Sequence, residues 1–406
     1  MTQSRRSAFL SGIVENLHTR SSITGSTKSI FSSSTQRRMS LHQRESFQDS
    51  ELATTDKIVG RDEELKILLQ CYNRMKTNQK LEIILIHGTS GSGKTSLVQE
   101  FMKNQPLNAF CVQGKFDQFQ SNAAYSALVT ASDQLCRQIL RNPNSDEICD
   151  RIQSLLGPDI HLLGKLIPRL LEMTTDDSNY GIRHLDESTE KSFTRFKLLF
   201  RSFLRSVASP ENPLILFLDD LQWADIASLE VLKSLVNDGM LLNTIIICAF
   251  REGEMTDEKL RKYYLAKRIS MDDGSFSSSS VSEVRNIRIT NVFLDCLNIA
   301  HLNELVSFKL GMELSSTESL SQLIWKKTCG NPFYALNFLD MLHRNSFITK
   351  EKGKIWIWDE SQVLHMTNVS DNLATILESR IQSLSEKVRS ILQMASFIGY
   401  EFPLSI

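Results

Sequence analysis

A glycine-rich loop with one lysine lies early in the chain and has the residue types needed to bind phosphate. It spans Gly88–Thr95, follows the apolar run Ile83–Ile86 and precedes a helical pattern. Glycines let backbone N–H groups close around phosphate oxygens, and the dipole of the following helix favours the anion. A chance glycine-rich turn is the alternative, but the strand-to-helix context favours a P-loop that binds ATP or ADP. The nucleotide-binding candidates here are Gly88, Thr89, Ser90, Gly91, Ser92, Gly93, Lys94, Thr95 and Ser96.

Two of these residues have further expected roles. Lys94 supplies a positive charge for the β- and γ-phosphates, and we therefore also count it as catalytic. The Thr95 hydroxyl is a candidate ligand for Mg²⁺.

A pair of carboxylates ends a second apolar run, Leu214–Leu218. Carboxylates at the end of a buried strand are costly unless they meet a cation or hydrogen-bond donors. Beside a P-loop, the simplest interpretation is a Walker B motif, in which Asp219 holds Mg²⁺ through water and Asp220 polarises the attacking water. The alternative is a pair of helix-capping aspartates, which is common at strand ends.

An arginine follows a third apolar run, Ile246–Phe250. At the mouth of a buried strand, Arg251 can reach a γ-phosphate as a sensor, and we count it as a catalytic candidate. The alternative is a surface arginine that pairs with Glu252 or Glu254.

The elements that must position these residues alternate between strand and helix. Apolar periodicity predicts helices and strands in alternation from Asp62 to Phe250, which indicates a parallel α/β sheet. Beyond a Ser-rich stretch the pattern turns mainly helical, with one short strand. The predicted helices are 62–75, 94–101, 124–140, 193–207, 224–236, 303–310, 318–328, 335–343, 373–382 and 386–398, and the predicted strands are 83–86, 108–113, 214–218, 245–250 and 355–358.

Composition bounds the class of protein. Hydrophobic residues make up 41% of the 406 residues and the net charge is -1, so no global field draws the chain to nucleic acid or a membrane. The 7 cysteines form no CxxC pair, which argues against a disulfide framework or a zinc site and favours a cytoplasmic protein. The apolar run Leu241–Phe250 is too short to span a bilayer.

The first 56 residues are rich in Ser, Thr, Arg and Gln and poor in large apolar residues. Such a segment cannot bury enough surface to offset its ordering entropy, so we predict a disordered tail. Within it, Arg37–Ser40 matches a basophilic kinase site, and an organelle transit peptide is the alternative use of the tail.

Taken together, the motifs resemble a known family. The segments Val59–Glu64, Leu218–Asp225, Phe250–Arg251 and Gly330–Phe333 look like the STAND class of AAA+-related ATPases. They are most similar to the origin-recognition-like predicted ATPase module found in ATPase-containing hybrid kinases and MalT-type regulators. Gly114–Phe119, followed by Tyr125–Leu128, also looks like the version associated with kinases.

The resemblance implies roles for further residues. Val59, Gly60 and Arg61, together with Ile58, would border the adenine, and Pro332 in the Gly330–Pro332 turn would lie over the base and sugar. A plain turn is the alternative for that segment. Many AAA+ enzymes have Glu where this chain has Asp220, and the shorter side chain suits a slow switch.

The expected fold is a P-loop NTPase α/β core with a parallel sheet, followed by an α-helical lid and the start of a winged-helix domain. We expect a disordered tail at 1–56, the core at 57–268, a flexible insertion at 269–282, the lid at 283–384 and a truncated winged helix at 385–406. The segment Glu386–Ile398 resembles the first helix of such a domain.

Three functional hypotheses remain open. The leading one is an ATP-dependent signalling switch with slow hydrolysis, with a signalling protein or further C-terminal domains as partner and ATP-dependent homo-oligomers as an option. The second is an origin-recognition-like DNA-binding ATPase, which the near-neutral charge disfavours. The third is a module that binds nucleotide without turnover.

Overall fold

The computed structural model describes residues 58–118, 124–173, 189–237, 239–255, 281–284, 287–351, 355–366, 381–382 and 384–398. The predicted tail at 1–56, most of the insertion at 269–282 and most of the helix at 373–382 lie outside these residues. Among the described residues, no helix has the length and apolar character needed to cross a membrane.

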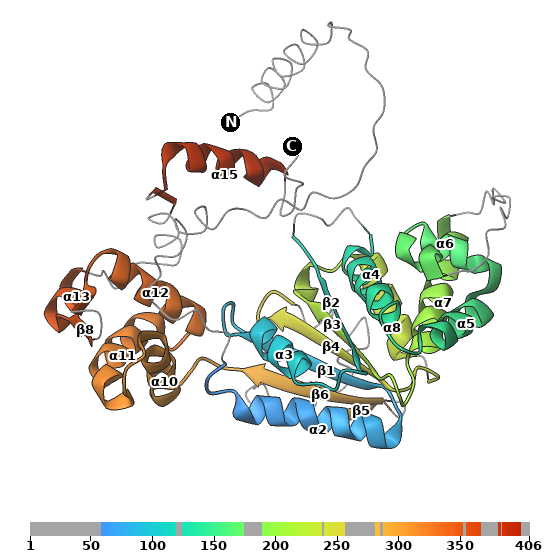
Figure 1. The fold of residues 1–406 in the computed structure, drawn as a ribbon, viewed down its shortest axis with the longest axis horizontal. Coiled ribbons are helices and arrows are strands. Elements are labelled where there is room, and N and C mark those ends of the chain that lie inside the picture. The colour runs from blue at the N-terminus through green and yellow to red at the C-terminus, as the bar shows by residue number, and fades with distance from the viewer. Residues whose placement is uncertain are drawn as a thin grey trace, which may run out of the picture. The chain divides into compact units, whose positions relative to one another are not determined.

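A six-stranded sheet forms the centre of the first part, in the order β2-β3-β4-β1-β6-β5 (Figure 1). The first five strands of this order, from β2 to β6, pair in parallel, and the edge strand β5 pairs antiparallel to β6. This order inserts β4 between β1 and β3, so the ends of these three strands are neighbours. The strands are β1 Glu82–Gly88, β2 Phe110–Lys115, β3 Leu214–Asp219, β4 Thr244–Arg251, β5 Val281–Val284 and β6 Ile287–Leu294.

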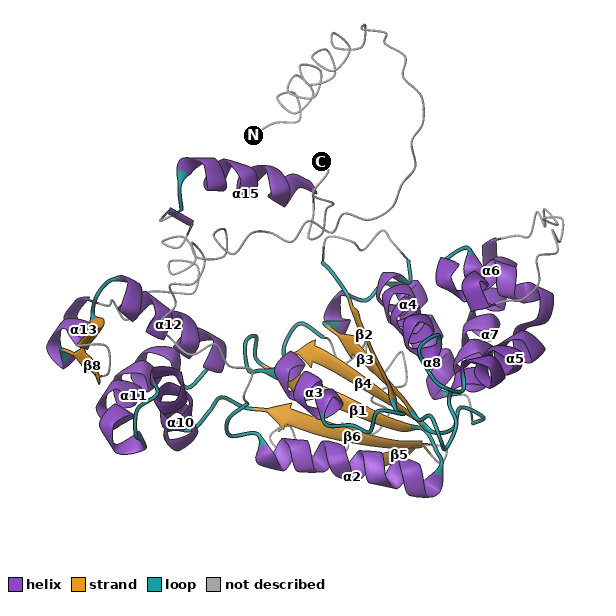
Figure 2. Cartoon of the chain, in the orientation of Figure 1, coloured by secondary structure: helices purple, strands orange, loops and turns teal. Residues whose placement is uncertain are grey.

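Helices cover both faces of the sheet, as Figure 2 shows. Successive side chains of a strand point to opposite faces, so Ile83 and Leu85 of β1 join one core while Ile84 and Ile86 join another. Strands buried on both faces explain the continuous apolar runs of the sequence. The first core also contains residues of α4 Ser126–Ile139, α5 Ser145–Leu156, α6 Ile160–Gly164, α7 Thr189–Val207 and α8 Ile226–Val236, and the second contains residues of α2 Asp62–Asn78 and α3 Lys94–Lys103.

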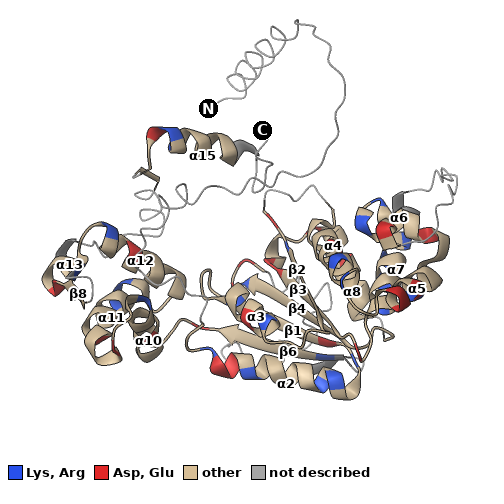
Figure 3. Ribbon diagram, viewed as in Figure 1, with Lys and Arg blue, Asp and Glu red and all other residues tan. Residues whose placement is uncertain are grey.

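The charged side chains at the two ends of α2 have the signs that the helix dipole favours. Its first turn has three acidic residues, Asp62, Glu63 and Glu64, and its last turn has Lys76 (Figure 3). Negative charge at a helix N-terminus and positive charge at its C-terminus each stabilise the helix by roughly 0.3–1 kcal/mol.

The mainly helical part that follows β6, residues 295–366, is called the lid below. It has a hydrophobic core of its own, which includes Leu302, Ile324, Leu339 and Trp356. The strand Ile348–Glu351, which pairs with the predicted strand Ile355–Trp358, was not predicted from the sequence. The elements from the lid onward are α10 Ile299–Leu310, α11 Leu314–Thr328, α12 Pro332–Arg344, β7 Ile348–Glu351, β8 Ile355–Trp358, α13 Glu360–Met366 and α15 Glu386–Ile398.

The boundary between core and lid differs from the sequence-based expectation. Residues 287–294, which we assigned to the lid, form β6 and pair in parallel with β1 along its whole length. Residues 281 and 282, which we assigned to the insertion, begin β5. The strand β6 was missed because it contains Arg288, Thr290 and Asn291 and lacks the continuous apolar run of the other central strands. Its partner β1 is also distant in sequence.

Candidate nucleotide-binding site

The P-loop connects β1 to α3 and has a backbone that only glycine adopts readily. Gly91 and Gly93 have φ angles of 79° and 96°, in the left-handed region. No side chain caps the N-terminus of α3, where Gly93 occupies the N-cap position. The first N–H groups of a helix have no partner within the helix, so they are available to an anion here.

The carbonyl groups at the start of the loop are held by the loop's own lysine. Lys94 Nζ donates to the carbonyl oxygens of Gly88 and Thr89, at 2.9 and 2.8 Å. The Lys94 side chain is 8% exposed, and burial lowers the pKa of its ammonium group, while Asp220 acts in the opposite direction. A lysine in this position is poised to exchange carbonyl partners for phosphate oxygens.

Donors from outside the loop hold its next three carbonyl groups. Asn331 Nδ2 donates to Ser90 O at 2.8 Å, and the Phe333 amide donates to Gly91 O at 3.3 Å. Arg61 Nη2 donates to Ser92 O at 3.0 Å. With these carbonyl groups already engaged, the fixed loop backbone can present its N–H groups to a ligand.

Ser92 provides an independent indication that a polar ligand belongs here. Its side chain is fully buried, and its Oγ has no hydrogen-bond partner among the described residues. A buried hydroxyl without a partner is costly, and a phosphate oxygen would satisfy it. The loop therefore fits the phosphates of ATP or ADP, which the sequence predicts.

Thr95 and Asp219 meet although they are far apart in sequence. Thr95 Oγ1 donates to Asp219 Oδ2 at 2.8 Å, which joins the start of α3 to the end of β3. Burial, and then Asp220, raises the pKa of the Asp219 carboxyl group, while the bond from Thr95 lowers it. A hydroxyl and a carboxylate in contact are oxygen ligands of the kind that Mg²⁺ uses, so both residues fit their predicted roles.

Asp220 lies at the centre of a small polar cluster. Lys115 Nζ lies 3.3 Å from its Oδ2, Arg251 Nε lies 3.7 Å from its Oδ1, and Gln222 Nε2 donates to Oδ1 at 2.9 Å. Its backbone φ is 53°, a conformation that costs a non-glycine residue free energy. Neither Lys115 nor Gln222 was predicted as a site residue, although both lie in the segments Gly114–Phe119 and Leu218–Asp225 that resemble the family.

Arg251 contacts the Asp220 cluster as well as the glutamate of the alternative interpretation. The β1–β4 register places Arg251 beside Gly88, and its guanidinium lies near Asp220. Its Nη1 also lies 3.2 Å from Glu254 Oε1, which is the surface ion pair that we named as the alternative. Trp223 packs against the guanidinium, with 4.6 Å between Arg251 Cζ and the ring centroid.

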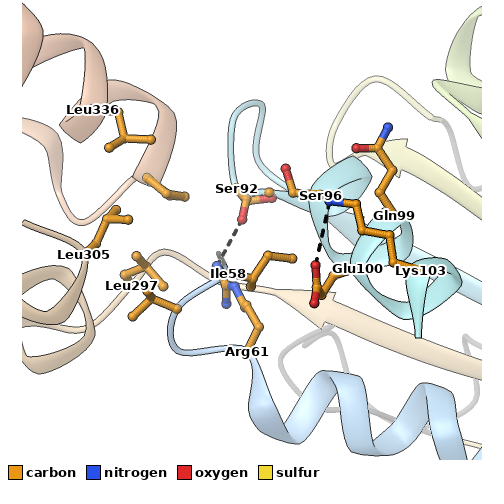
Figure 4. Close-up of a pocket in the computed structure, with 13 residues that line it drawn as sticks. Ile58, Arg61, Ser92, Ser96, Gln99, Glu100, Lys103, Leu297, Leu305 and Leu336 are labelled. Carbon is orange, nitrogen blue, oxygen red and sulfur yellow. Dashed lines mark hydrogen bonds and ion pairs between the residues drawn. The ribbon is translucent and has the colours of Figure 1, made fainter. Parts of the chain in front are cut away.

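A cavity of about 260 Å³ lies beside the P-loop, between α3 and the lid (Figure 4). Seven residues that we predicted to bind the nucleotide line it, including Ile58 and Pro332. Others do not line it, namely Gly60, Gly88, Thr89, Ser90, Gly91, Lys94 and Thr95. Leu297, Leu305 and Leu336 were missed because apolar lid residues look like ordinary core in sequence. The lining consists of Ile58, Val59, Arg61, Ser92, Gly93, Ser96, Gln99, Glu100, Lys103, Leu297, Leu305, Pro332 and Leu336.

Arg61 and Gly60, which precede α2, make contacts that were not part of their expected role beside the adenine. Arg61 lines the cavity, but its guanidinium also bonds to Asp295 O at 2.6 Å and pairs with Glu64. Gly60 has φ of 65°, and a Cβ there would lie 2.4 Å from the His301 ring. Gly60 therefore allows a close approach to the lid.

Comparison with known proteins agrees with this geometry. Residues 57–247 match a family model described as an AAA ATPase domain. The chain contains an AAA ATPase domain. This domain includes the P-loop, Asp219 and Asp220, and its match ends within β4, just before Arg251.

A relative from Dictyostelium discoideum, hybrid signal transduction histidine kinase G, is 28% identical over 421 aligned positions, covering 87% of this chain. The chain spans only 11% of that relative's length.

Solved structures also resemble the chain. A STAND protein with a tetratricopeptide repeat sensor from Pyrococcus horikoshii has 16% identity and a TM-score of 0.38, covering 85% of this chain and 35% of its own. Drosophila ORC bound to DNA has 12% identity and a TM-score of 0.41, and the match covers 97% of this chain and 88% of the ORC chain. TM-scores this low carry no argument, and the fold rests on the sheet order and the P-loop described above.

Proposed function

We propose that the AAA ATPase domain and the lid together form an ATP-binding regulatory switch of the STAND class, which hydrolyses ATP slowly and acts in signal transduction. The observation that carries this proposal is the direct bond between lid and P-loop. Asn331 of the lid donates to Ser90 O, and the Phe333 amide donates to Gly91 O. A movement of Ser90 or Gly91 on nucleotide binding would therefore act directly on the N-terminus of α12.

Nucleotide binding would use the residues that already meet around the loop. The N–H groups at the start of α3 and the Lys94 ammonium would bind the phosphates. Thr95 and Asp219 would hold Mg²⁺, whose charge would help to neutralise the triphosphate. The apolar cavity wall, with Val59 and Pro332, would take the adenine.

Slow hydrolysis is supported by the surroundings of Asp220. A general base must be oriented toward the water that it polarises. The Asp220 carboxylate is instead engaged by Lys115, Gln222 and Arg251. Turnover would require at least part of this cluster to rearrange, which suits a switch better than a rapid enzyme.

The γ-phosphate would set the state of the switch. It distinguishes ATP from ADP through Lys94, Arg251 and Mg²⁺, and a ligand shifts a conformational equilibrium only through such differential affinity. Pro332 occupies the first turn of α12, directly after the Asn331 N-cap. Its fixed φ makes the connection between the loop contact and the helix stiff.

The signalling context is supported by the name of the Dictyostelium relative, a hybrid signal transduction histidine kinase. We propose that the switch acts in the cytoplasm on a signalling protein or on further C-terminal domains. ATP-dependent homo-oligomers are part of the same proposal.

Hydrogen exchange across residues 318–345 tests the switch, measured with ADP and then with a non-hydrolysable ATP analogue. We expect different protection of α12 in the two states. Pro332→Gly should reduce that difference while sparing most of the phosphate contacts. Identical protection with both nucleotides would reduce the proposal to a static nucleotide-binding module.

Lys94→Ala serves as the binding control in this experiment. The change removes a charge-assisted contact with the phosphates, so ATP affinity should fall by about tenfold or more. Calorimetric titration measures the affinity, and circular dichroism checks that the fold is retained. Unchanged affinity in a folded variant would refute the role of the P-loop.

A further inference from the structure

The cavity beside the P-loop has two chemically different walls. Residues before α2 and in the lid form an apolar wall that includes Val59, Leu305 and Leu336. The outer face of α3 forms the opposite wall, where Glu100 and Lys103 contribute charged groups (Figure 4). The apolar wall suits the flat face of a nucleobase. The proposed binding of the base and the phosphates gives the charged wall no role.

Helix geometry places the charged wall at a definite distance from the phosphate end. Ser96 lies in the first turn of α3, where the anion would bind. Glu100 is four residues further on and therefore about 6 Å along the helix axis. In a nucleotide the sugar lies between the phosphates and the base. With the phosphates at the start of α3 and the base against the lid, Glu100 lies at the level of the sugar.

Neighbouring side chains hold the Glu100 carboxylate. Asn104 Nδ2 donates to its Oε1 at 3.2 Å, and Lys103 Nζ lies 4.0 Å from its Oε2. A carboxylate has about four acceptor positions, so these two contacts leave capacity for another donor. Gln99 is directed elsewhere, because its amide donates to Gln113 Oε1 of β2.

We infer that Glu100 recognises the ribose diol of the bound nucleotide by accepting a hydrogen bond from a ribose hydroxyl group. The inference rests on the proposed binding of ATP. An ionised carboxylate is a strong acceptor for a hydroxyl donor, whereas it would repel a phosphate placed at the same point. An acidic residue that hydrogen-bonds a ribose hydroxyl serves the same purpose in dinucleotide-binding folds. Glu100 thus determines the specificity for the sugar, while the apolar wall binds the base.

Calorimetric titration of the full chain with ATP and with 2′,3′-dideoxy-ATP tests this inference. The wild type should bind ATP about tenfold more tightly than the dideoxy nucleotide, the effect expected for one hydrogen bond to a charged group. In Glu100→Met the two affinities should become nearly equal. ATP should bind more weakly to this variant, while the affinity for the dideoxy nucleotide should stay unchanged. Methionine keeps the length and helix propensity of glutamate and removes both acceptor oxygens.

Glu230→Met is the matched control. Glu230 lies on α8 and also has a lysine partner three residues later, with 3.8 Å between Lys233 Nζ and its Oε1. The side chains of Glu100 and Glu230 are equally exposed, at 30%. Because Glu230 does not line the cavity, this variant should keep the preference of the wild type for ATP.

Three results would overturn the inference and leave the proposed function standing. The first is equal affinity of the wild type for ATP and the dideoxy nucleotide, the second is an undiminished preference in Glu100→Met, and the third comes from the control variant. A wild-type chain that binds neither nucleotide would overturn the proposed function and the inference together. If Glu230→Met lost the preference for ATP as fully as Glu100→Met, the cause would be the loss of a negative charge in general. That result would refute a specific contact between Glu100 and the ribose.

Discussion

Asp219 and Asp220 are consecutive in sequence but face different surroundings. Asp219 accepts a hydrogen bond from Thr95 and is 2% exposed, while Asp220 has a left-handed backbone and faces Lys115 and Arg251. Residues held in such conformations concentrate at functional sites, where their surroundings compensate for the strain. The different backbone conformations of the two residues thus separate a candidate metal-binding carboxylate, Asp219, from a candidate general base, Asp220.

Substitution of each carboxylate by its amide should separate the two roles. Asp219→Asn removes a charge beside the metal site, so the dependence of ATP affinity on Mg²⁺ should weaken. Asp220→Asn should leave affinity near the wild-type value and lower hydrolysis by about 10²-fold or more, the usual contribution of a general base. ATP titration with Mg²⁺ or EDTA, and a phosphate-release assay, measure these effects. If both variants lost ATP affinity equally, the separate roles would be wrong.

His87 adds a pH-dependent feature directly before the P-loop. It is 4% exposed, with its ring centroid 5.7 Å from that of Phe250 and 5.3 Å from that of Phe293. Burial, and then the charge of Lys94, lowers its pKa from 6.5 to about 4. The buried imidazole is therefore neutral at pH 7.

The free energy of unfolding should fall between pH 6.5 and pH 4 through His87. In that window the unfolded chain binds a proton at His87 and the folded chain does not, so acid favours unfolding by up to about 3 kcal/mol. His87→Phe removes this contribution. Urea unfolding at pH 7 and pH 5 should show a smaller loss of stability in the variant than in the wild type. Equal losses would contradict a depressed pKa.

At the scale of elements, the N-terminus of α12 has two functions. The Asn331 side-chain oxygen caps the helix by accepting from the amides of Phe333 and Tyr334. Its side-chain nitrogen donates to Ser90 O in the P-loop. One amide group thus joins the start of a lid helix to the loop that would hold phosphate.

Asn331→Ala should be more damaging than the loss of an ordinary helix cap. Asn298 provides the comparison, because it caps α10 through the His301 amide. Asn298→Ala should destabilise the chain by about 1 kcal/mol. Asn331→Ala should cost roughly 1 kcal/mol more, because it also leaves the loop bond unmade, and it should weaken ATP binding. Thermal unfolding and ATP titration compare the variants, and equal effects would show that the loop bond contributes nothing.

At the scale of the whole molecule, the nucleotide cavity is assembled from three distant stretches of chain. The segment before α2, the P-loop with α3, and the lid each supply part of its lining. Arg61 connects all three, since it bonds to Ser92 O in the loop and to Asp295 O at the start of the lid. Core and lid therefore share the site.

Residues 1–56 should be dispensable for nucleotide binding. Among the residues that the structure describes, those that line the cavity all lie at or beyond Ile58. A chain that begins at residue 57 should bind ATP with the affinity of the full chain, as measured by titration. We also expect limited proteolysis to remove the first 56 residues before it cuts the core. Loss of ATP binding in the trimmed chain would refute this prediction.

The sequence alone determined the parts of this protein that depend on local pattern. Buried parallel strands are continuous apolar runs, so β1, β3 and β4 could be located to within a few residues. The P-loop and the Asp219–Asp220 pair follow because their chemistry depends on residue types at fixed spacing. The 7 cysteines are scattered along the chain, and none forms a disulfide in the structure.

Tertiary structure alone decided which distant groups meet. Parallel pairing beside β1 placed β6 in the core sheet, because strand pairing is a non-local choice that a polar strand does not reveal. The same folding brought Lys115 to Asp220, Asn331 to Ser90 and the lid leucines to the cavity. These contacts depend on side-chain directions after the chain has closed on itself, and no local spacing encodes them.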